Sequence, residues 1–221
     1  MKINVAVDGP AGAGKSTLAK AAAKELGFIY VDTGALYRSI AYYVIKKGAD
    51  PKSAEQVVPL LDEINPELRY TDGVQHVFVN GEDVSGLIRT PEISMGASGV
   101  SAIPQVREFL FKLQKDIAAE NNIIMDGRDI GTVVLPHAQV KVYLTASDKV
   151  RADRRYKELC EKGQAPSYDE VLADIRQRDY NDMNRDISPL RQAEDAVLLD
   201  TSDDTLEQAL QRLVSLIKEK M

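Results

Sequence analysis

Eight consecutive residues near the start of the chain form a pattern that can hold phosphate groups. They read Gly9-Pro10-Ala11-Gly12-Ala13-Gly14-Lys15-Ser16, complete the pattern G-x-x-x-x-G-K-[ST], and are followed by Thr17. Glycines let the backbone curl so that its N–H groups point at phosphate oxygens. Lys15 can reach the β- and γ-phosphates of a nucleoside triphosphate, and Ser16 can offer its hydroxyl to Mg²⁺. We therefore expect a triphosphate to bind at this loop.

A second segment with suitable chemistry runs from Val31 to Arg38, where an apolar run passes into a helix-forming stretch. Thr33 can cap that helix, whose N-terminus is a natural anion site. Arg38 lies about one turn into the helix, where its guanidinium could bind a phosphate through two hydrogen bonds. The structural alternative is an ordinary capped helix with a solvated arginine.

A third segment, Met125-Asp126-Gly127-Arg128-Asp129, ends another apolar run. In open α/β sheets the carboxyl ends of the strands face the ligand crevice. An aspartate there can lie near a metal, and an arginine can neutralise a phosphoryl group in transfer. The structural alternative is a turn built on Asp-Gly.

Arginine is concentrated in one part of an otherwise acidic chain. Seven of the thirteen arginines lie between residues 151 and 191, namely Arg151, Arg154, Arg155, Arg176, Arg178, Arg185 and Arg191. The spacing places Arg151 and Arg155 on one helical face, and Arg178, Asp182 and Arg185 on another. This clustering predicts a hairpin of helices that holds an anion. The alternative is a salt-bridged, solvent-exposed helix, because acidic residues are interleaved throughout.

The elements that must position these residues alternate between strand and helix. Apolar runs indicate strands at 3–7, 28–31, 123–125, 140–144 and 196–199, and helix-forming stretches cover 17–26, 35–47, 148–162 and 204–220. Such alternation predicts an α/β fold with a five-stranded parallel sheet flanked by helices.

The middle of the chain has a different pattern. Residues 68–70 and 74–79 read as a hairpin around a turn at 71–73, and Asn80-Gly81 is a turn signal before a short third strand at 82–84. A small antiparallel sheet is therefore expected at about 64–88. Residues 91–121 return to helix, with Pro104 opening a second helical segment.

Composition excludes several classes of function. The 221 residues carry 28 basic and 34 acidic side chains, a net charge of −6, so broad nucleic-acid or membrane binding is not expected. The single cysteine cannot form an internal disulfide, which fits a reducing cytoplasm. No apolar stretch approaches membrane-spanning length, and the first residues do not read as a signal peptide.

In the order and spacing of its motifs, the chain resembles bacterial cytidylate kinases, a family of nucleoside monophosphate kinases. Five stretches carry the resemblance over essentially the whole chain, and they are residues 8–17, 32–38, 81–90, 126–134 and 178–185. The Gly-Glu-Asp-Val-Ser-Gly and Asp-Gly-Arg-Asp-Ile-Gly-Thr-Val-Val runs are the most specific. The resemblance implies transfer of the γ-phosphate of ATP to CMP or dCMP with Mg²⁺.

The resemblance also implies a single P-loop kinase domain over 1–221. Its core would cover about 1–32, 123–150 and 192–221, its monophosphate-binding region about 33–122 with the β insert at 64–88, and its lid about 151–191. We expect a cytoplasmic monomer whose partners are ATP and CMP or dCMP, with no nucleic acid and no membrane.

The site residues that the resemblance implies fall into four groups. The catalytic group would be Lys15, Arg128, Asp129, Arg155 and Arg178. ATP would be bound by residues 9–17 with Arg151 and Arg155, and Mg²⁺ by Ser16, with Asp126 acting through water. In the acceptor group, Thr33, Arg38 and Arg128 would face the CMP phosphate, Ser98, Arg107, Asp129 and Arg185 the cytosine, and Arg178 and Asp182 the pentose.

Two other functions stay open, a different P-loop kinase and a non-catalytic regulator, and the sequence argues against a third, a signalling GTPase. A different P-loop small-molecule or monophosphate kinase would share the loop and the lid but not the acceptor pocket. A signalling GTPase needs an Asn-Lys-x-Asp segment, and the chain has no Asn-Lys pair. A non-catalytic ATP-binding regulator would bind ATP without releasing ADP in response to CMP.

Overall fold

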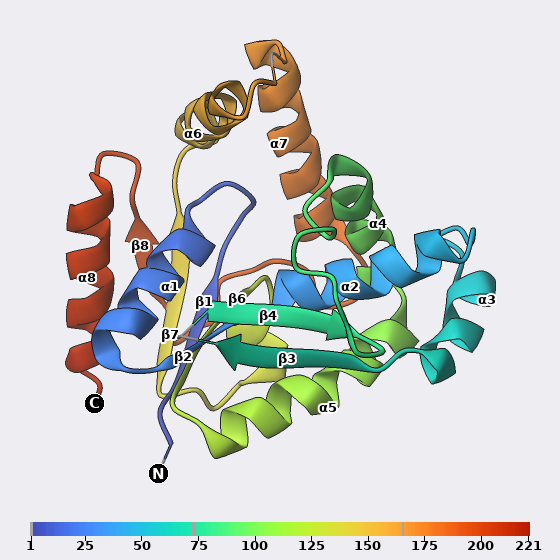
Figure 1. The fold of residues 1–221 in the computed structure, drawn as a ribbon. Helices are drawn as coiled ribbons and strands as arrows, with labels where there is room; N and C mark the ends of the chain where they lie inside the picture. Colours follow the sequence, from blue (N-terminus) through green and yellow to red (C-terminus); the bar gives the residue numbers. More distant parts are fainter. Residues whose placement is uncertain (1, 72–73, 165) are drawn as a thin grey trace. The chain divides into compact units, whose positions relative to one another are not determined.

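The computed structural model describes residues 2–71, 74–164 and 166–221 (Figure 1). The chain forms two compact units, of which the first comprises residues 1–28 and 122–221 and the second residues 29–121. Two residues of the predicted hairpin turn, Asp72 and Gly73, lie outside the described residues.

The first unit alternates strands and helices as the sequence predicts. Its strands are β1 (Asn4–Asp8), β6 (Ile123–Gly127), β7 (Val140–Thr145) and β8 (Val197–Asp200), and its helices are α1 (Lys15–Leu26), α6 (Asp148–Glu161), α7 (Tyr168–Asn184) and α8 (Leu206–Lys218). One turn of π-helix at Ile130–Val134 follows β6 and was not predicted.

The parallel sheet has the strand order β2-β6-β1-β7-β8, where β2 (Ile29–Asp32) is the first element of the second unit. The predicted five-stranded parallel sheet is therefore confirmed. Strand β1 pairs in parallel with β6 and with β7, and this register places Val7 opposite Asp126 and Asp8 opposite Gly127. All residues of β6 are buried, which explains why this strand reads as a continuous apolar run.

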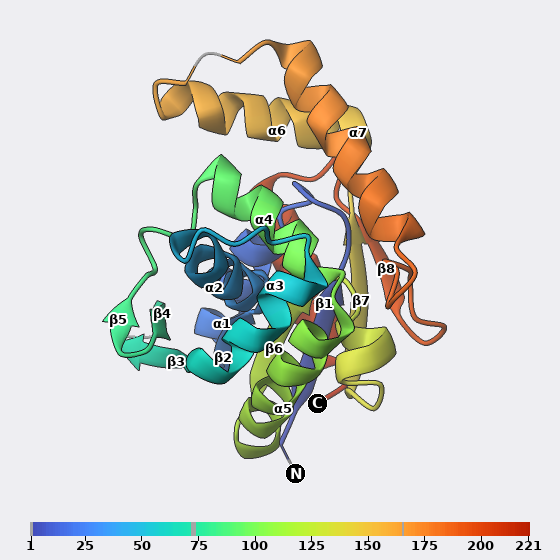
Figure 2. The ribbon, with the colours of Figure 1, turned by 90° about the vertical axis from the view of Figure 1, so that its right-hand side faces the viewer.

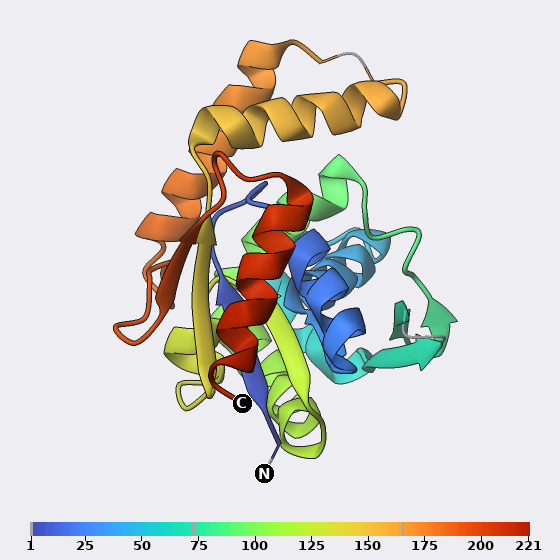
Figure 3. The same ribbon diagram turned by 90° about the vertical axis from the view of Figure 1, so that its left-hand side faces the viewer.

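Helices α1 and α8 pack against each other along the strands of the first unit (Figure 3). The contact is possible because each helix presents one apolar face, with Leu18 and Ala22 buried on α1 and Leu213 and Ile217 buried on α8. Small alanines on α1 let it lie close to its neighbours. The helix begins directly after the phosphate loop, so this packing holds the loop at one end.

Helices α6 and α7 form a hairpin at the predicted lid segment (Figure 2). Ser147 caps α6, and Ser167 opens α7 with a reciprocal capping box to Glu170. The hairpin buries a small apolar cluster of Ala152, Val171 and Ile175.

The second unit combines helices with the predicted small sheet. Its helices are α2 (Thr33–Lys46), the short α3 (Ala54–Val57), a 3₁₀ helix at Val58–Glu63, α4 (Pro91–Ser101) and α5 (Pro104–Glu120). Strands β3 (Pro66–Thr71), β4 (Val74–Val79) and β5 (Glu82–Asp83) form an antiparallel sheet in that order. The antiparallel insert and the helix start at Pro104 are confirmed, whereas α3 and the 3₁₀ helix were not predicted.

The helices within the described ranges are too short or too polar to cross a lipid bilayer.

Candidate active site

The phosphate loop joins β1 to α1, which is the strand, loop and helix order that the motif requires. Gly14 lies at the N-cap of α1 in the left-handed region, with φ of 88°. Lys15 begins the helix and is buried, and its Nζ donates a hydrogen bond to the carbonyl oxygen of Pro10 at 2.8 Å. The lysine ammonium is therefore held over the loop that would surround the phosphates.

Gly9 is held against the neighbouring strand β7. Its φ is 150°, and a Cβ placed on it would lie 1.9 Å from the carbonyl oxygen of Leu144. No side chain fits at that distance, so the start of the loop is fixed by direct backbone contact.

The two residues predicted to hold Mg²⁺ are in contact. The hydroxyl of Ser16 donates to Oδ2 of Asp126 at 2.7 Å, although 110 residues separate them in the chain. The contact follows from the parallel pairing of β1 and β6, which brings the end of β6 beside the loop. Hydroxyl and carboxylate oxygens are the hard donors that Mg²⁺ prefers, so this pair fits a magnesium ion.

Lys15 lies in a strongly charged and water-poor environment. Burial lowers the pKa of Lys15 to about 7, the positive charge of Arg128 acts in the same direction, and the carboxylates of Asp126, Asp182 and Asp8 oppose the shift. A lysine whose charge is poorly solvated gains most from a new anionic partner, as a triphosphate would be.

Asp8, at the end of β1, is a second buried ionisable group. Burial raises the pKa of Asp8 to about 6, against two backbone hydrogen bonds from Gly131 and Ile130. Asp8 lies in the stretch 8–17 that carries the family resemblance, but the sequence analysis assigns it no role.

Four of the predicted acceptor-binding residues form two ion pairs. Nε of Arg128 donates to Oδ2 of Asp182 at 2.6 Å, and Nη2 of Arg185 lies 3.5 Å from Oδ1 of Asp129. Burial disfavours the charge of Arg128, but the carboxylates of Asp182, Asp126 and Asp8 together outweigh it, so the pKa of Arg128 is raised. The loop after β6 and the end of α7 are thereby brought together.

The prediction that Arg185 shares a helical face with Arg178 and Asp182 is wrong. Helix α7 ends at Asn184, and Arg185 has an extended backbone with ψ of 143°. Its Nε donates to the carbonyl oxygen of Ser188 at 2.7 Å, so the side chain follows the outgoing chain.

Arg151 connects the phosphate loop to the lid hairpin. Its guanidinium donates to the carbonyl oxygens of Ala11 and Ala146 at 2.9 and 2.8 Å. It also binds both carboxylate oxygens of Asp179 on α7, at 3.0 and 2.6 Å. All these partners are protein atoms, and its predicted contact with ATP stays a prediction.

The other two lid arginines of the predicted site are more exposed. Arg155 pairs with Glu158 at 2.9 Å, and Arg178 lies 3.8 Å from Asp174. Their side chains are 40% and 41% exposed, so both guanidinium groups remain accessible to an anion.

In the second unit, the start of α2 carries Thr33 and Arg38. Asp32, not Thr33, is the N-cap, because the Asp32 side chain accepts the N–H of Ala35 at 2.9 Å and Thr33 is already helical. The other oxygen of Asp32 accepts from Nη2 of Arg38 at 2.9 Å. The predicted capping role of Thr33 is therefore wrong, whereas its predicted contact with phosphate is untested.

Ser98 and Arg107 lie on the consecutive helices α4 and α5. Ser98 is exposed, and its carbonyl oxygen accepts the hydroxyl of Ser101 at 3.0 Å. Arg107 is buried, donates to the carbonyl oxygen of Ser101 at 3.4 Å, and lies 5.8 Å from the centre of the Tyr37 ring. Ser101 thus links the two predicted base-binding residues.

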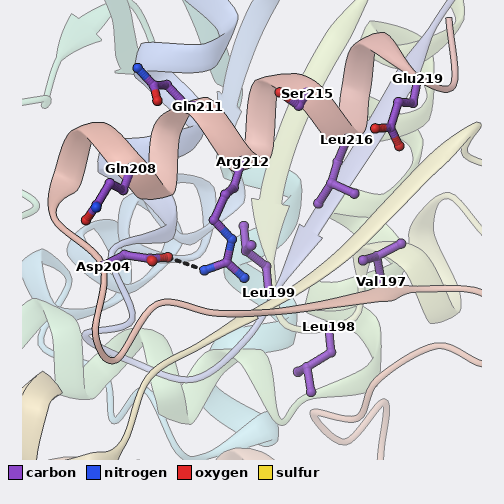
Figure 4. A pocket seen from close by; sticks show the side chains of 10 residues that line it. All are labelled: Val197, Leu198, Leu199, Asp204, Gln208, Gln211, Arg212, Ser215, Leu216 and Glu219. Carbon is purple, nitrogen blue, oxygen red and sulfur yellow. Dashed lines mark hydrogen bonds and ion pairs between the residues drawn. The ribbon is translucent and has the colours of Figure 1, made fainter.

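An open groove of about 510 Å³ lies between β8 and α8 (Figure 4). Within it Arg212 forms an ion pair with Asp204 and donates to the carbonyl oxygen of Asp200. The groove shares no residue with the predicted site, since it is lined by Val197, Leu198, Leu199, Asp204, Gln208, Gln211, Arg212, Ser215, Leu216 and Glu219.

Three carboxylates that support the predicted site were missed by sequence reasoning. Asp8 binds the backbone after β6, Asp32 binds Arg38, and Asp179 binds Arg151. Asp32 lies in the stretch 32–38 and Asp179 in the stretch 178–185, but only the tertiary structure reveals their partners. For Asp8 the available signal was a charged residue that ends a buried apolar strand.

Comparison with known proteins gives matches over nearly the whole chain. Residues 5–219 match the family described as cytidylate kinase. A cytidylate kinase of Caldicellulosiruptor saccharolyticus is 49% identical over 215 residues, covering 97% of this chain and 95% of that protein. A cytidylate kinase of Fervidobacterium nodosum is 46% identical over 220 residues, covering 100% and 98%.

A solved structure supports the fold alone. It is an uncharacterized protein from Eubacterium ventriosum ATCC 27560, with a TM-score of 0.51 at 11% identity over 99% of each chain. The family itself follows from the full-length sequence matches. The chain belongs to the cytidylate kinase family.

Proposed function

We propose that the residues of the candidate site transfer the γ-phosphate of ATP to CMP or dCMP, giving ADP and CDP or dCDP. Family membership makes the chain a (d)CMP kinase, and the roles of individual residues are our own assignment. The observation that carries this assignment is the contact of Ser16 with Asp126 at 2.7 Å, beside the buried Lys15.

On the donor side, the backbone N–H groups of residues 9–17 bind the phosphates of ATP, supported by Lys15, Arg151 and Arg155. Ser16 would hold Mg²⁺, with Asp126 acting through water. When bound, the ion supplies positive charge that neutralises the phosphates. Ser16 and Asp126 fit the ion because both side chains offer oxygen atoms beside the phosphate loop.

On the acceptor side, the proposed roles follow the parts of CMP. Thr33, Arg38 and Arg128 bind its phosphate. The cytosine is bound by Ser98, Arg107, Asp129 and Arg185, and the pentose by Arg178 and Asp182. The ion pairs of Arg128 with Asp182 and of Arg185 with Asp129 support the first-unit members of these sets.

The chemistry needs positioning and charge neutralisation rather than a protein nucleophile. A phosphate oxygen of CMP attacks the γ-phosphorus of ATP, and the bond from that phosphorus to the β,γ-bridging oxygen breaks, so that this oxygen leaves with ADP. Lys15 and Arg128 are preorganised cations that stabilise the charge on the transferring group. Arg155 and Arg178 add to this charge from the lid, and Asp129 holds the acceptor base.

We also propose that the protein acts as a monomer in the cytoplasm, without nucleic-acid or membrane partners. The net charge of −6 supports the absence of nucleic-acid and membrane partners, because it disfavours binding to such anionic surfaces.

The activity is tested by coupling ADP release to a spectrophotometric signal with and without CMP. We expect ADP only when ATP, Mg²⁺ and CMP or dCMP are all present, with CDP or dCDP recovered by ion-exchange chromatography. ATP binding without CMP-dependent ADP release would indicate a regulator, and a preference for AMP would indicate a different monophosphate kinase.

The lid segment 151–191 is expected to move. Its partly exposed arginines Arg155 and Arg178 gain favourable charge interactions when the segment closes over a triphosphate. Amide hydrogen exchange measured by mass spectrometry should be fast there in the free protein and slow with ATP analogue and CMP bound. Equal protection in both states would contradict a lid.

The same segment offers a mutational test of function against structure. Arg155→Ala and Arg178→Ala should each lower kcat while leaving the melting temperature nearly unchanged, because both side chains are about 40% exposed. A variant that mainly loses thermal stability would show that its arginine has a structural role.

A further inference from the structure

Asp8 is a buried carboxylate to which the proposed phosphoryl transfer gives no role. It ends strand β1, directly before the phosphate loop, and only 5% of its surface is exposed. Each of its oxygens accepts one backbone hydrogen bond, Oδ1 from Ile130 at 2.8 Å and Oδ2 from Gly131 at 2.7 Å. Burial of a charged group is costly unless it is hydrogen-bonded, so this geometry needs both partners.

These two N–H groups belong to the residues that directly follow Arg128 and Asp129. They begin the π-helical turn Ile130–Val134, whose other end is also fixed, because the carbonyl oxygen of Asp129 accepts the N–H of Val133 at 2.9 Å. The backbone that carries Arg128 and Asp129 is therefore attached to β1 through Asp8, 122 residues away in the chain.

Gly131 makes this close approach possible. A Cβ on Gly131 would lie 3.3 Å from Oδ2 of Asp8 and 3.2 Å from Cδ of Lys141. Both distances are shorter than ordinary contacts, so an added side chain would require the carboxylate, the Lys141 side chain or the turn to shift by a few tenths of an ångström.

We propose that Asp8 is a positioning residue for acceptor recognition. Its carboxylate holds the backbone at Ile130 and Gly131, and this sets where Arg128 and Asp129 present their side chains. The inference rests on the proposed function, from which it takes the roles of Arg128 and Asp129 toward CMP. The competing possibility is that Asp8 supports the adjacent phosphate loop and therefore ATP.

Asp8→Asn separates these two possibilities. The amide keeps the shape of the side chain but turns one acceptor oxygen into a donor that faces a backbone N–H. We expect kcat/KM for CMP to fall roughly 30- to 100-fold, the size of effect that a misplaced catalytic group produces. The KM for ATP should stay within about threefold of its original value, because both hydrogen bonds of Asp8 come from the turn after β6 and neither comes from residues 9–17.

Gly131→Ala disturbs the same contact from the opposite side while Asp8 is retained. It should also lower kcat/KM for CMP while leaving the KM for ATP nearly unchanged. If Asp8→Asn does not fold, this variant tests the positioning role. Thr201→Val is the matched control, because Thr201 is buried in the same unit and donates to the carbonyl oxygen of Thr145 at 3.1 Å. It should lower thermal stability without changing the parameters of either nucleotide.

The outcomes are distinguishable when the unmodified protein is assayed first with ATP and CMP. Its failure to phosphorylate CMP would reject the proposed function itself. If it is active, an equal rise in the KM for ATP and the KM for CMP in Asp8→Asn or Gly131→Ala overturns the positioning role. So does a profile like that of Thr201→Val, in which stability falls and both KM values and kcat persist.

Discussion

Lys15→Met is expected to lower kcat with ATP, Mg²⁺ and CMP at least about a hundredfold. Loss of one preorganised positive group removes on the order of 3 kcal/mol of transition-state stabilisation. Lys15 is the buried cation of the phosphate loop, held 2.8 Å from the carbonyl oxygen of Pro10. The coupled ADP-release assay under saturating substrates measures the effect.

The same variant should keep its thermal stability at pH 6. Burial lowers the pKa of Lys15 from 10.5 to about 7, so the folded state binds this proton less tightly than the unfolded chain does. The resulting destabilisation is fully present below pH 7 and is relieved as the pH rises from 7 toward 10.5. Methionine removes the buried charge, and calorimetry should show an unchanged or higher melting temperature. Turnover near that of the unmodified protein would refute the phosphate-loop assignment.

CMP is expected to be preferred over UMP by roughly a hundredfold in kcat/KM. Cytosine has an N4 amine donor and an N3 acceptor, whereas uracil has an O4 acceptor and an N3–H donor. The carboxylate of Asp129 can accept from the N4 amine, and Arg107 or Arg185 can donate to N3 or O2. Uracil would place an acceptor opposite an acceptor and a donor opposite a donor. Each buried polar group left unpaired in this way costs about 1–3 kcal/mol of binding free energy.

Asp129→Asn should reduce this preference at least about tenfold, because an amide can donate to the O4 atom of uracil. Asp116→Asn is the matched control, since Asp116 is an exposed carboxylate on α5 that pairs with Lys112. Steady-state kinetics with CMP, dCMP, UMP and AMP provide the comparison. Similar kcat/KM values for CMP and UMP in the unmodified protein would contradict base reading by these residues.

Most of the fold could be predicted because its elements are locally encoded. Buried parallel strands such as β6 read as unbroken apolar runs, and Pro104 indicates the start of α5. The short α3 and the π-turn after β6 lack such a signal. The π-turn depends on Asp8, a residue from a distant strand that binds its first two N–H groups.

The candidate site could be predicted in its residue types but not in its pairings. Because the carboxyl ends of the strands face one crevice, Asp126 is expected near the phosphate loop, and the structure places its Oδ2 atom 2.7 Å from the hydroxyl of Ser16. The partner of Arg151 depends on how α6 packs on α7, which periodicity does not specify. Helical spacing also failed at Arg185, because the chain leaves the helix one residue earlier.

Substitutions at Gly9 and Lys15 should have different effects when variants are selected for folding and when they are selected for kinase activity. The carbonyl oxygen of Leu144 occupies the space where any side chain on Gly9 would begin, with only 1.9 Å between them. A saturation library sorted for protease resistance should therefore lose every replacement at Gly9. The same library should retain apolar replacements at Lys15, which only a selection for kinase activity would remove. Comparing the substitutions that survive each selection would thus distinguish Gly9, which the fold requires, from Lys15, which the reaction requires.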